Sequence, residues 1–578
     1  MTFAPSRSIL RACSLVGLAL AGFGCTGSIQ RPGATGSTAN GGTPGTTVGS
    51  GGAAGTAPIG VTPPVVGPCV AAAAFAPARL WRLNDQQYGN VVRDVFGAGI
   101  TVPADVSEAR SAGAEDLARA ESLAIGNDTI AANYMSSAHA TALSAVKALP
   151  ALVGCATPDA TCVTTFLETK VARAFRRPLT DGEVADMLAL YQLAATDGPS
   201  EGVRVLMEYV LQAPAFLWRT ELAGVDPTKA ATAPQPLNPY ELAGALGFLF
   251  LDSAPDDGLW AKAAAGTLTK PDVLGAEVDR LMALPAVKVN IANKVGSWLT
   301  IKKTEATVKD PTIFPEFTPA VKDALTSSAQ LFLQDVVFTG KLGDLVTSRK
   351  MFLNKDLATL YGVPGVTSST LVPVDVTLPE RAGGILTQPA ILAANSRVNR
   401  GDPIHRGLFI YSSLVCGNPV PAPPANATTL DQSLPATATE RDRANFRASR
   451  GDCSACHVHF DPLGLLSERY DPIGRYREKD ASGQVIDQSS TINLGSKVLD
   501  GPANGLPDLI TRLQSSRDFA DCAAGRLASV AVGRTVSTDN SCALQNVRDT
   551  FATSASFMGL FRAIATSPAF TTRGGAVQ

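Results

Sequence analysis

The amino-acid sequence predicts a mainly α-helical, multi-domain protein with little β structure. Helix-start signals recur along the chain, and each is followed by apolar residues that return every three or four positions. Strand signals are few. The clearest are the stretch 371–376 and a hairpin in which residues 484–487 follow a turn at 480–483. The chain beyond residue 68 is long enough for several domains of ordinary size.

The N-terminal 68 residues predict export rather than a folded domain. Two arginines precede the apolar run 12–23, which is too short to span a bilayer and is typical of a secretory signal. The run leads to Gly24-Cys25, which resembles a bacterial lipoprotein processing site, so we expect residues 1–25 to be a lipoprotein-type signal peptide with Cys25 lipidated. Residues 26–68 are almost all Gly, Thr, Ala, Pro and Ser and predict a flexible linker, or merely a disordered leader if Cys25 is not lipidated.

These features predict a protein outside the cytoplasm, either anchored as a lipoprotein in the outer membrane or at the cell surface, or periplasmic. Lys and Arg number 49 and Asp and Glu 51, and the net charge of −2 argues against nucleic acid as a general partner. No other apolar stretch is long enough for a transmembrane helix, so we expect contact with a membrane through the lipid anchor only.

Helical modules are expected to make up the body. The clearest helices begin at Asn84, at Thr180 in a capping box, at Asn238 and at Thr318. Their apolar stripes indicate core-facing helices rather than cofactor sites. We place helical modules at 69–150, 151–229 and 230–305, a fourth module at 306–418, a Pro-rich spacer at 419–444, a segment with a cysteine motif at 445–488 and a C-terminal helical module at 489–578. The spacer could equally be a surface loop.

The cysteine motif is the stretch Asp452-Cys453-Ser454-Ala455-Cys456-His457. Cys-x-x-Cys-His is the pattern of covalent haem attachment, in which each thiol forms a thioether and the adjacent imidazole becomes an axial ligand of the iron. With 10 Cys and 4 His in 578 residues, on the order of 10⁻³ such motifs would arise by chance. We therefore predict one covalent haem c on Cys453 and Cys456, with His457 as proximal ligand, in a small cytochrome c-like segment.

The residues after the motif predict an ordered pocket next to it. Residues 461–464 and 471–474 share the pattern Asp-Pro-x-Gly, which is typical of a type I turn. Between the two turns, the apolar residues Leu465, Leu466 and Tyr470 could wall a pocket. Arg475 and Arg477 suit bidentate binding of a propionate, although solvated arginines are the simpler interpretation.

Three other interpretations of the cysteine pair remain open. Zinc would need two more ligands, which His457, His459 and Cys416 could supply, but no second cysteine pair follows at finger spacing. A thioredoxin-like dithiol needs a βαβ context that the sequence lacks. A disulfide of Cys453 or Cys456, with Cys416 as one candidate partner, does not require the adjacent histidine, so the motif favours haem.

The remaining cysteines of an exported chain are expected to form disulfides. Setting aside Cys13, Cys25 and the motif pair leaves an even number: Cys69, Cys155, Cys162, Cys416, Cys522 and Cys542. Cys155 and Cys162 are close in sequence and could close a short loop, and Cys522 and Cys542 flank a predicted helix and turn. These spacings alone do not decide the pairing.

Several stretches together resemble the modules of large secreted bacterial proteins related to the planctomycete-type cytochrome c family. They follow one another from Leu80 onward, at 80–97, 173–180, 211–221, 237–243, 254–258, 383–388, 406–416, 522–542 and 567–570. The resemblance implies export, a mostly helical body, and the disulfides Cys155–Cys162 and Cys522–Cys542. It implies little about activity, because most of these modules are domains of unknown function. His405 departs from the family pattern, in which an aliphatic residue is usual.

Three classes of function follow. The first is electron transfer by an exported haem protein that exchanges electrons with a redox partner protein or a small-molecule oxidant or reductant. The second is a haem-dependent peroxidase or oxidase acting on an organic or polymeric substrate, for which the sequence offers no recognisable acid–base constellation. The third is a non-catalytic surface binding protein with a disulfide in place of haem.

The sixth ligand of the iron would separate the first class from the second. His405 and Met558 are the candidate distal ligands, and an open or water-bound iron is the remaining alternative. His139 and His459 are weaker candidates, because His139 lies in an Ala-rich helical stretch and His459 is only two residues from His457.

Overall fold

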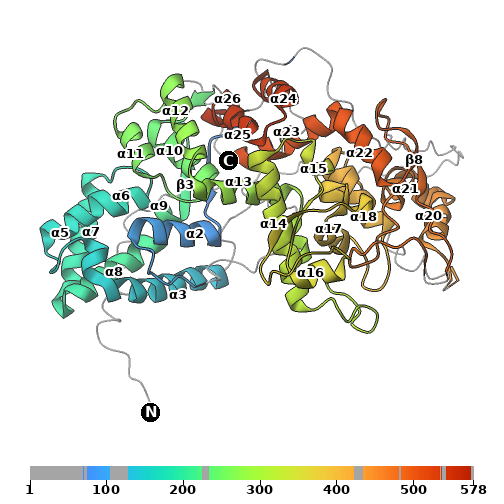
Figure 1. The fold of residues 1–578 in the computed structure, drawn as a ribbon. Helices are drawn as coiled ribbons and strands as arrows, with labels where there is room; N and C mark the ends of the chain where they lie inside the picture. The colour runs from blue at the N-terminus through green and yellow to red at the C-terminus, as the bar shows by residue number, and fades with distance from the viewer. Residues whose placement is uncertain are drawn as a thin grey trace, which may run out of the picture.

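The computed structural model describes residues 69, 75–103, 128–223, 234–421, 434–435, 437–480, 483–533, 536 and 542–574. The predicted signal peptide, its lipidation site Cys25, the linker 26–68 and residues 422–433 of the spacer lie outside the described residues. The described chain is mainly α-helical, as predicted, and its strands are few and short (Figure 1). Among the helices described, none is both long and apolar enough to cross a bilayer.

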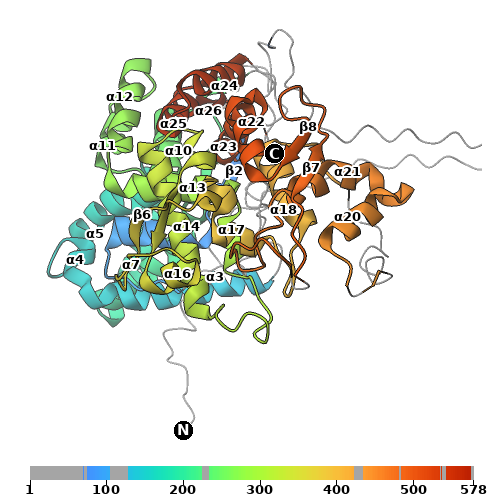
Figure 2. The ribbon, with the colours of Figure 1, turned by 45° about the vertical axis from the view of Figure 1, so that its right-hand side comes forward.

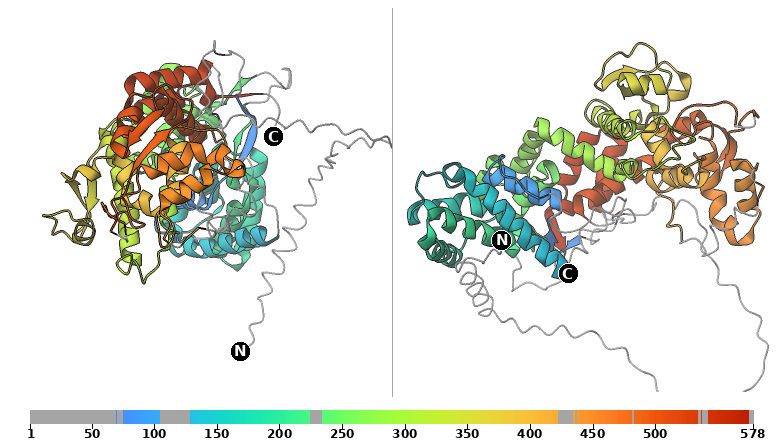
Figure 3. Two further views of the ribbon diagram at one scale, coloured as in Figure 1. Left: turned by 90° about the vertical axis from the view of Figure 1, so that its right-hand side faces the viewer. Right: turned by 90° about the horizontal axis from the view of Figure 1, so that it is seen from below.

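The first helices form a lobe at one end of the molecule, drawn in blue to teal in Figures 1 and 3. Its helices are α2 (Asp85–Val91), α3 (Asp128–Ala145), α4 (Leu149–Val153), α5 (Ala160–Phe166), α6 (Ala172–Ala174), α7 (Asp181–Ala194), α8 (Pro199–Gln212) and α9 (Pro214–Leu217). Short 3₁₀ or π-helical turns lie at Val92–Phe96, Val146–Ala148, Leu167–Val171 and Ala195–Asp197. One hydrophobic cluster fills this lobe and reaches from Leu83 to Leu217, with Phe248 and Ala254 added from the following segment.

A second and larger hydrophobic cluster is formed by buried residues between Ala223 and Phe570. Its helices are α10 (Pro239–Leu246), α11 (Asp257–Ala264), α12 (Pro271–Met282), α13 (Pro285–Trp298), α14 (Pro319–Thr339), α15 (Asp344–Thr347), α16 (Lys355–Leu360), α17 (Pro389–Ala394), α18 (Pro403–Phe409), α20 (Glu440–Ala448), α21 (Gly451–Leu465), α22 (Leu506–Ser515), α23 (Arg517–Val532), α24 (Cys542–Ser554), α25 (Phe557–Ala565) and α26 (Pro568–Thr571). Short helical turns lie at Gly247–Leu251, Ile301–Thr304, Pro379–Arg381, Gly384–Thr387 and Ile410–Leu414. The later modules expected from the sequence share this one cluster, so their boundaries do not separate independent cores.

Short paired strands connect both ends of the described chain to its middle. The strands are β1 (Ala76–Pro77), β2 (Arg79–Arg82), β3 (Trp218–Glu221), β4 (Gln235–Pro236), β5 (Lys350–Leu353), β6 (Val372–Asp375), β7 (Ser489–Ile492), β8 (Gly501–Asn504) and β9 (Thr572–Gly574). β9 lies between β1, to which it is parallel, and β4, while β2–β3, β5–β6 and β7–β8 are antiparallel pairs. Buried Glu221 accepts hydrogen bonds from Arg79 Nε at 3.0 Å and Arg573 Nη2 at 2.7 Å. A buried carboxylate between two guanidinium groups therefore joins the start of the fold to its end.

The predicted helix starts are confirmed by their hydrogen bonds. Asn84, Thr180 and Asn238 each form a reciprocal capping box with the residue three positions later, and the Thr318 side chain caps α14. The predicted strand at 371–376 appears as β6. The hairpin predicted after 480–483 is reduced to one antiparallel bridge between Lys479 and Val485, with residues 481–482 outside the described part.

Helices α18 and α21 cross at very short range because glycine occupies both contact points. A Cβ added at Gly407 would lie 1.8 Å from the carbonyl oxygen of Phe460, and one added at Gly464 would lie 1.9 Å from the carbonyl oxygen of Pro403. The two helices are thus antiparallel, with the start of α18 beside the end of α21. This contact fixes the helix that carries the cysteine motif against the main core.

Candidate functional site

The whole Cys-x-x-Cys-His motif lies in the first half of α21. Asp452 occupies the first turn, where a negative charge is favoured by the helix dipole. Cys453 is buried and Cys456 is partly buried, and the structure leaves both thiols free. Burial raises the pKa of both thiols, and the neighbouring Asp452 carboxylate raises that of Cys453 further. A raised pKa disfavours the thiolate, which is the nucleophilic form of cysteine.

His457 is oriented by a carboxylate one helical turn later. Its Nδ1 donates a hydrogen bond to Oδ1 of Asp461 at 2.9 Å, and Arg447 Nε on α20 donates to Oδ2 of the same carboxylate, also at 2.9 Å. The Asp461 side chain is only 3% exposed. Because Nδ1 is engaged, the other ring nitrogen, Nε2, is the one available to a metal. A buried carboxylate that fixes the ring and tautomer of a histidine is typical of metal-binding sites.

The turn predicted at 461–464 is wrong, because α21 continues through Pro462 to Leu465. Proline removes only the hydrogen bond to the carbonyl of Val458, and the contacts of Asp461 and Gly464 on the buried side hold the helix in place. For this reason Asp461 was not predicted as the partner of His457, nor Arg447 as the partner of Asp461. The i,i+4 spacing of His457 and Asp461 would have revealed the pair if the helix had been extended by one turn.

The second predicted turn, at 471–474, is confirmed by the Gly474 N–H, which donates to the Asp471 carbonyl at 3.0 Å. Arg475 binds Asp471 and Glu316, and Arg477 binds Glu468, so both guanidinium groups already have carboxylate partners. These ion pairs, rather than solvent or a propionate, account for the two arginines.

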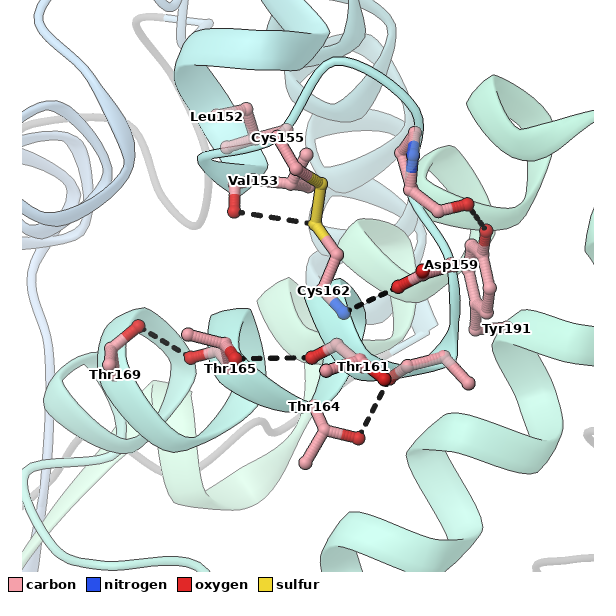
Figure 4. The surroundings of a disulfide bond; sticks show 12 residues. Leu152, Val153, Cys155, Asp159, Thr161, Cys162, Thr164, Thr165, Thr169 and Tyr191 are labelled. Carbon is pink, nitrogen blue, oxygen red and sulfur yellow. Dashed lines mark hydrogen bonds between the residues drawn. A yellow bond between two sulfur atoms is a disulfide. The ribbon is translucent and has the colours of Figure 1, made fainter.

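The structure corrects one predicted disulfide and confirms another. Cys155 pairs with Cys162, next to α5, where Asp159 caps the helix (Figure 4). Cys522 does not pair with Cys542. Instead, Cys416 pairs with Cys522 and Cys69 with Cys542. The partners come from segments 106 and 473 residues apart, which only the packing of the whole chain brings together.

These pairs bear directly on the alternatives for Cys453 and Cys456. Cys416 is bound to Cys522 and so serves neither as a zinc ligand nor as their disulfide partner. His459 Nδ1 donates to the carbonyl oxygen of Asn493 at 2.6 Å. Within the described ranges, no group of three or more His, Cys, Asp or Glu side chains is arranged to hold a metal ion.

The candidate distal ligands are not brought to the motif. His405 lies near the start of α18, beside the end of α21, with its side chain 53% exposed and its Nδ1 2.6 Å from Asp402 Oδ2. Met558 lies on α25, which packs against α12, α14, α23, α24 and α26. Figures 1 and 2 show α25 well separated from α21. His139 pairs with Glu208 in the N-terminal lobe.

A cleft opens on the other side of His457. It has a volume of about 930 Å³ and is lined mainly by residues of α20, α21 and the β7–β8 pair. Figure 2 shows where these elements lie in the fold. His457, Val458, Asp461, Pro462 and Leu465 line it from α21, whereas neither Cys453 nor Cys456 does. Successive helix positions turn by about 100°, so Cys456 and Val458 point to opposite sides of His457. The two thiols and the cleft therefore occupy different faces of the helix.

An aromatic contact extends from the thiol side of the motif into the core. The rings of His457 and Phe460 have centroids 4.8 Å apart, and those of Phe460 and buried Tyr411 are 6.4 Å apart. Of the residues expected to wall a pocket, Leu465 lines the cleft, and Leu466 and Tyr470 belong to the main core.

Four family models match successive parts of the chain, and each is described as a protein of unknown function: DUF1595 at 162–221, DUF1592 at 237–363, DUF1588 at 382–480 and DUF1585 at 501–570. The DUF1588 match contains α18, α21 and the whole motif. The DUF1592 match runs across the module boundary expected at 305, in agreement with the shared core. No curated protein and no solved structure matches the chain. All four domains are those of the planctomycete-type cytochrome c proteins, and the chain belongs to that family.

Proposed function

We propose that this protein is an exported c-type haem protein that transfers electrons at the cell surface or in the periplasm. One haem would be attached to Cys453 and Cys456, with His457 as proximal ligand. The observation that carries the proposal is the state of the thiols. The other six described cysteines are all in disulfides, whereas these two, three positions apart on one helix, remain free.

The residues around the motif fit a haem. His457 has one ring nitrogen engaged by Asp461 and the other available, which is the arrangement a histidine ligand needs. Arg447 holds the Asp461 carboxylate from the neighbouring helix, so the ring orientation is supported from two helices. When bound, haem would supply a one-electron redox centre. The chain would hold the ligand, exclude water on the side of Phe460 and Tyr411, and set the electron donation of the imidazole through Asp461.

Export is part of the proposal and has its own support. Three disulfides in the described part of the chain are typical of an oxidising compartment. We propose that Cys25 carries a lipid anchor and that the redox partner is another exported protein or a small-molecule oxidant or reductant. Metabolic labelling with a fatty acid should mark the parent chain and not a Cys25→Ser variant, and labelling of both would contradict lipidation at this position.

Haem attachment can be tested on the full chain, produced with its signal peptide in a host that carries cytochrome c maturation machinery. The parent should give a c-type pyridine haemochrome spectrum, and the peptide containing Cys453 and Cys456 should carry the mass of haem. The Cys453→Ala, Cys456→Ala double variant should lose both signals. The Cys416→Ala, Cys522→Ala double variant is the matched control, because it removes two other cysteines and should keep the haem. A parent without the spectrum, or a motif variant that retains it, would refute the proposal.

A further inference from the structure

The cleft beside His457 has the construction of a ligand site. Its volume of about 930 Å³ is within the range of small-molecule pockets, roughly 300–1,000 Å³. Its apolar lining comes from short aliphatic side chains on three elements: Ala444, Ala448, Val458, Pro462, Leu465, Pro502 and Ala503. His457 is the only residue of the Cys-x-x-Cys-His motif in the lining, and most of the remaining lining belongs to α20 and the β7–β8 pair.

The charged side chains that line the cleft are already engaged by the protein. Arg441 Nε lies 3.1 Å from Asp487 Oδ2, and Asp461 is held by Arg447 and His457. Asp508 Oδ2 accepts a hydrogen bond from the Asn504 N–H at 2.7 Å. Because Arg441 is paired with Asp487, an anionic ligand would find no free arginine or lysine among the lining residues.

The uncharged polar side chains of the lining are, by contrast, available. Asn445, Ser490, Thr491, Asn493 and Asn504 line the cleft, and their side chains have no hydrogen-bond partner within the part of the chain that the structure describes. Together they present amide and hydroxyl groups that can both donate and accept. Asn445 comes from α20 on one side. Ser490, Thr491 and Asn504 come from the β7–β8 pair on the other side, and Asn493 directly follows β7, so one ligand could be bound from both walls.

We infer that this cleft binds a neutral saccharide. A sugar combines several hydroxyl groups with faces of C–H groups and carries no charge, which matches free amide and hydroxyl groups around an aliphatic lining. The assignment does not depend on haem, because the residues that would make the hydrogen bonds are not those of the Cys-x-x-Cys-His motif.

Calorimetric titration of the full mature chain with three neutral hexasaccharides, from maltose, cellobiose and N-acetylglucosamine units, would test the inference. At least one should bind with a dissociation constant below about 1 mM. Thr491→Trp on β7 and Ala448→Trp on α20 fill the cleft from opposite walls and should each weaken binding at least about tenfold. Asn504→Ala removes one hydrogen-bonding group and should weaken it about fivefold to tenfold.

Thr511→Trp is the matched control, because Thr511 is exposed on α22 and does not line the cleft. It should bind as the parent does, and so should the Cys453→Ala, Cys456→Ala variant, which separates this result from that of the haem proposal. Absence of heat with all three sugars, binding that survives both cleft-filling variants, or binding of a neutral peptide such as hexaglycine in place of the sugars would each overturn the inference.

Discussion

If haem is attached as proposed, replacing Asp461 by Asn should raise its midpoint potential. The carboxylate accepts the hydrogen bond of His457 Nδ1 at 2.9 Å and is almost fully buried. In the proposed haem protein it would increase electron donation from the imidazole and so favour the oxidised iron. Asparagine has nearly the same shape and can still accept the hydrogen bond, but it carries no charge. The substitution therefore changes the electronic effect on His457 with little change in packing.

The size of the shift can be worked from the contact. A hydrogen bond to a charged group contributes about 1.5–3 kcal/mol. Arg447 shares the same carboxylate at 2.9 Å and offsets part of its charge, so the lower end applies here. For a one-electron couple, about 1.4 kcal/mol corresponds to about 59 mV, and we expect the potential to rise by about 60 mV.

Spectroelectrochemical titration of the haem-loaded chain would measure this shift directly. Asp452→Asn is the matched control, because Asp452 adjoins Cys453 but pairs with Arg450 on the surface and does not touch His457, and it should move the potential by less than about 20 mV. Arg447→Gln should shift the potential in the opposite direction, since it leaves the full charge of the carboxylate on His457. An unchanged potential in Asp461→Asn, or equal shifts in both Asp→Asn variants, would refute the reasoning.

Three further predictions concern stability. Non-reducing peptide mapping should find the Cys416–Cys522 bridge, and replacing both residues by Ser should lower the free energy of unfolding in urea by about 4–5 kcal/mol, as expected for a loop of about 100 residues. Gly407→Ala should destabilise the fold by more than about 3 kcal/mol or prevent folding, because the new Cβ would overlap a backbone carbonyl, whereas Gly451→Ala, with no atom within 4 Å, should be neutral or stabilising in the same assay. Burial raises the pKa of Glu468 to about 7, so its protonated form favours the folded state: stability should fall by about 3 kcal/mol as pH rises from about 4 to 7, and Glu468→Gln should remove that loss. Intact stability in Gly407→Ala, or the same pH profile with and without Glu468, would contradict these assignments.

The fold class and the position of the motif could be predicted from sequence because both depend on neighbouring residues. A helix start needs one capping side chain and a residue three positions later, which is why the helices that begin after Asn84, Thr180, Asn238 and Thr318 appear where expected. The turn at 471–474 is local in the same sense. The Cys-x-x-Cys-His spacing is itself a local requirement of the attachment chemistry.

At 461–464, the same kind of local pattern gave a wrong prediction. Asp-Pro-x-Gly is compatible with a turn, but Gly464 is needed for the close approach of α18, and Asp461 is needed by His457 and Arg447. Contacts with other elements thus outweighed the local preference of residues 461–464 for a turn. Because a turn was expected there, Asp461 was not predicted as the hydrogen-bond partner of His457.

The sequence by itself determined the helical character, the helix starts and the chemical identity of the motif, because each follows from a few residues close together in the chain. Tertiary structure alone decided that Cys522 pairs with Cys416 and Cys542 with Cys69, and that the β7–β8 pair faces α20 and α21 across a cleft. It also placed Met558 away from α21. These contacts join residues far apart in sequence, and the free energy that selects them comes from burying one hydrophobic core shared by the chain from residue 223 to 570, which no local pattern records.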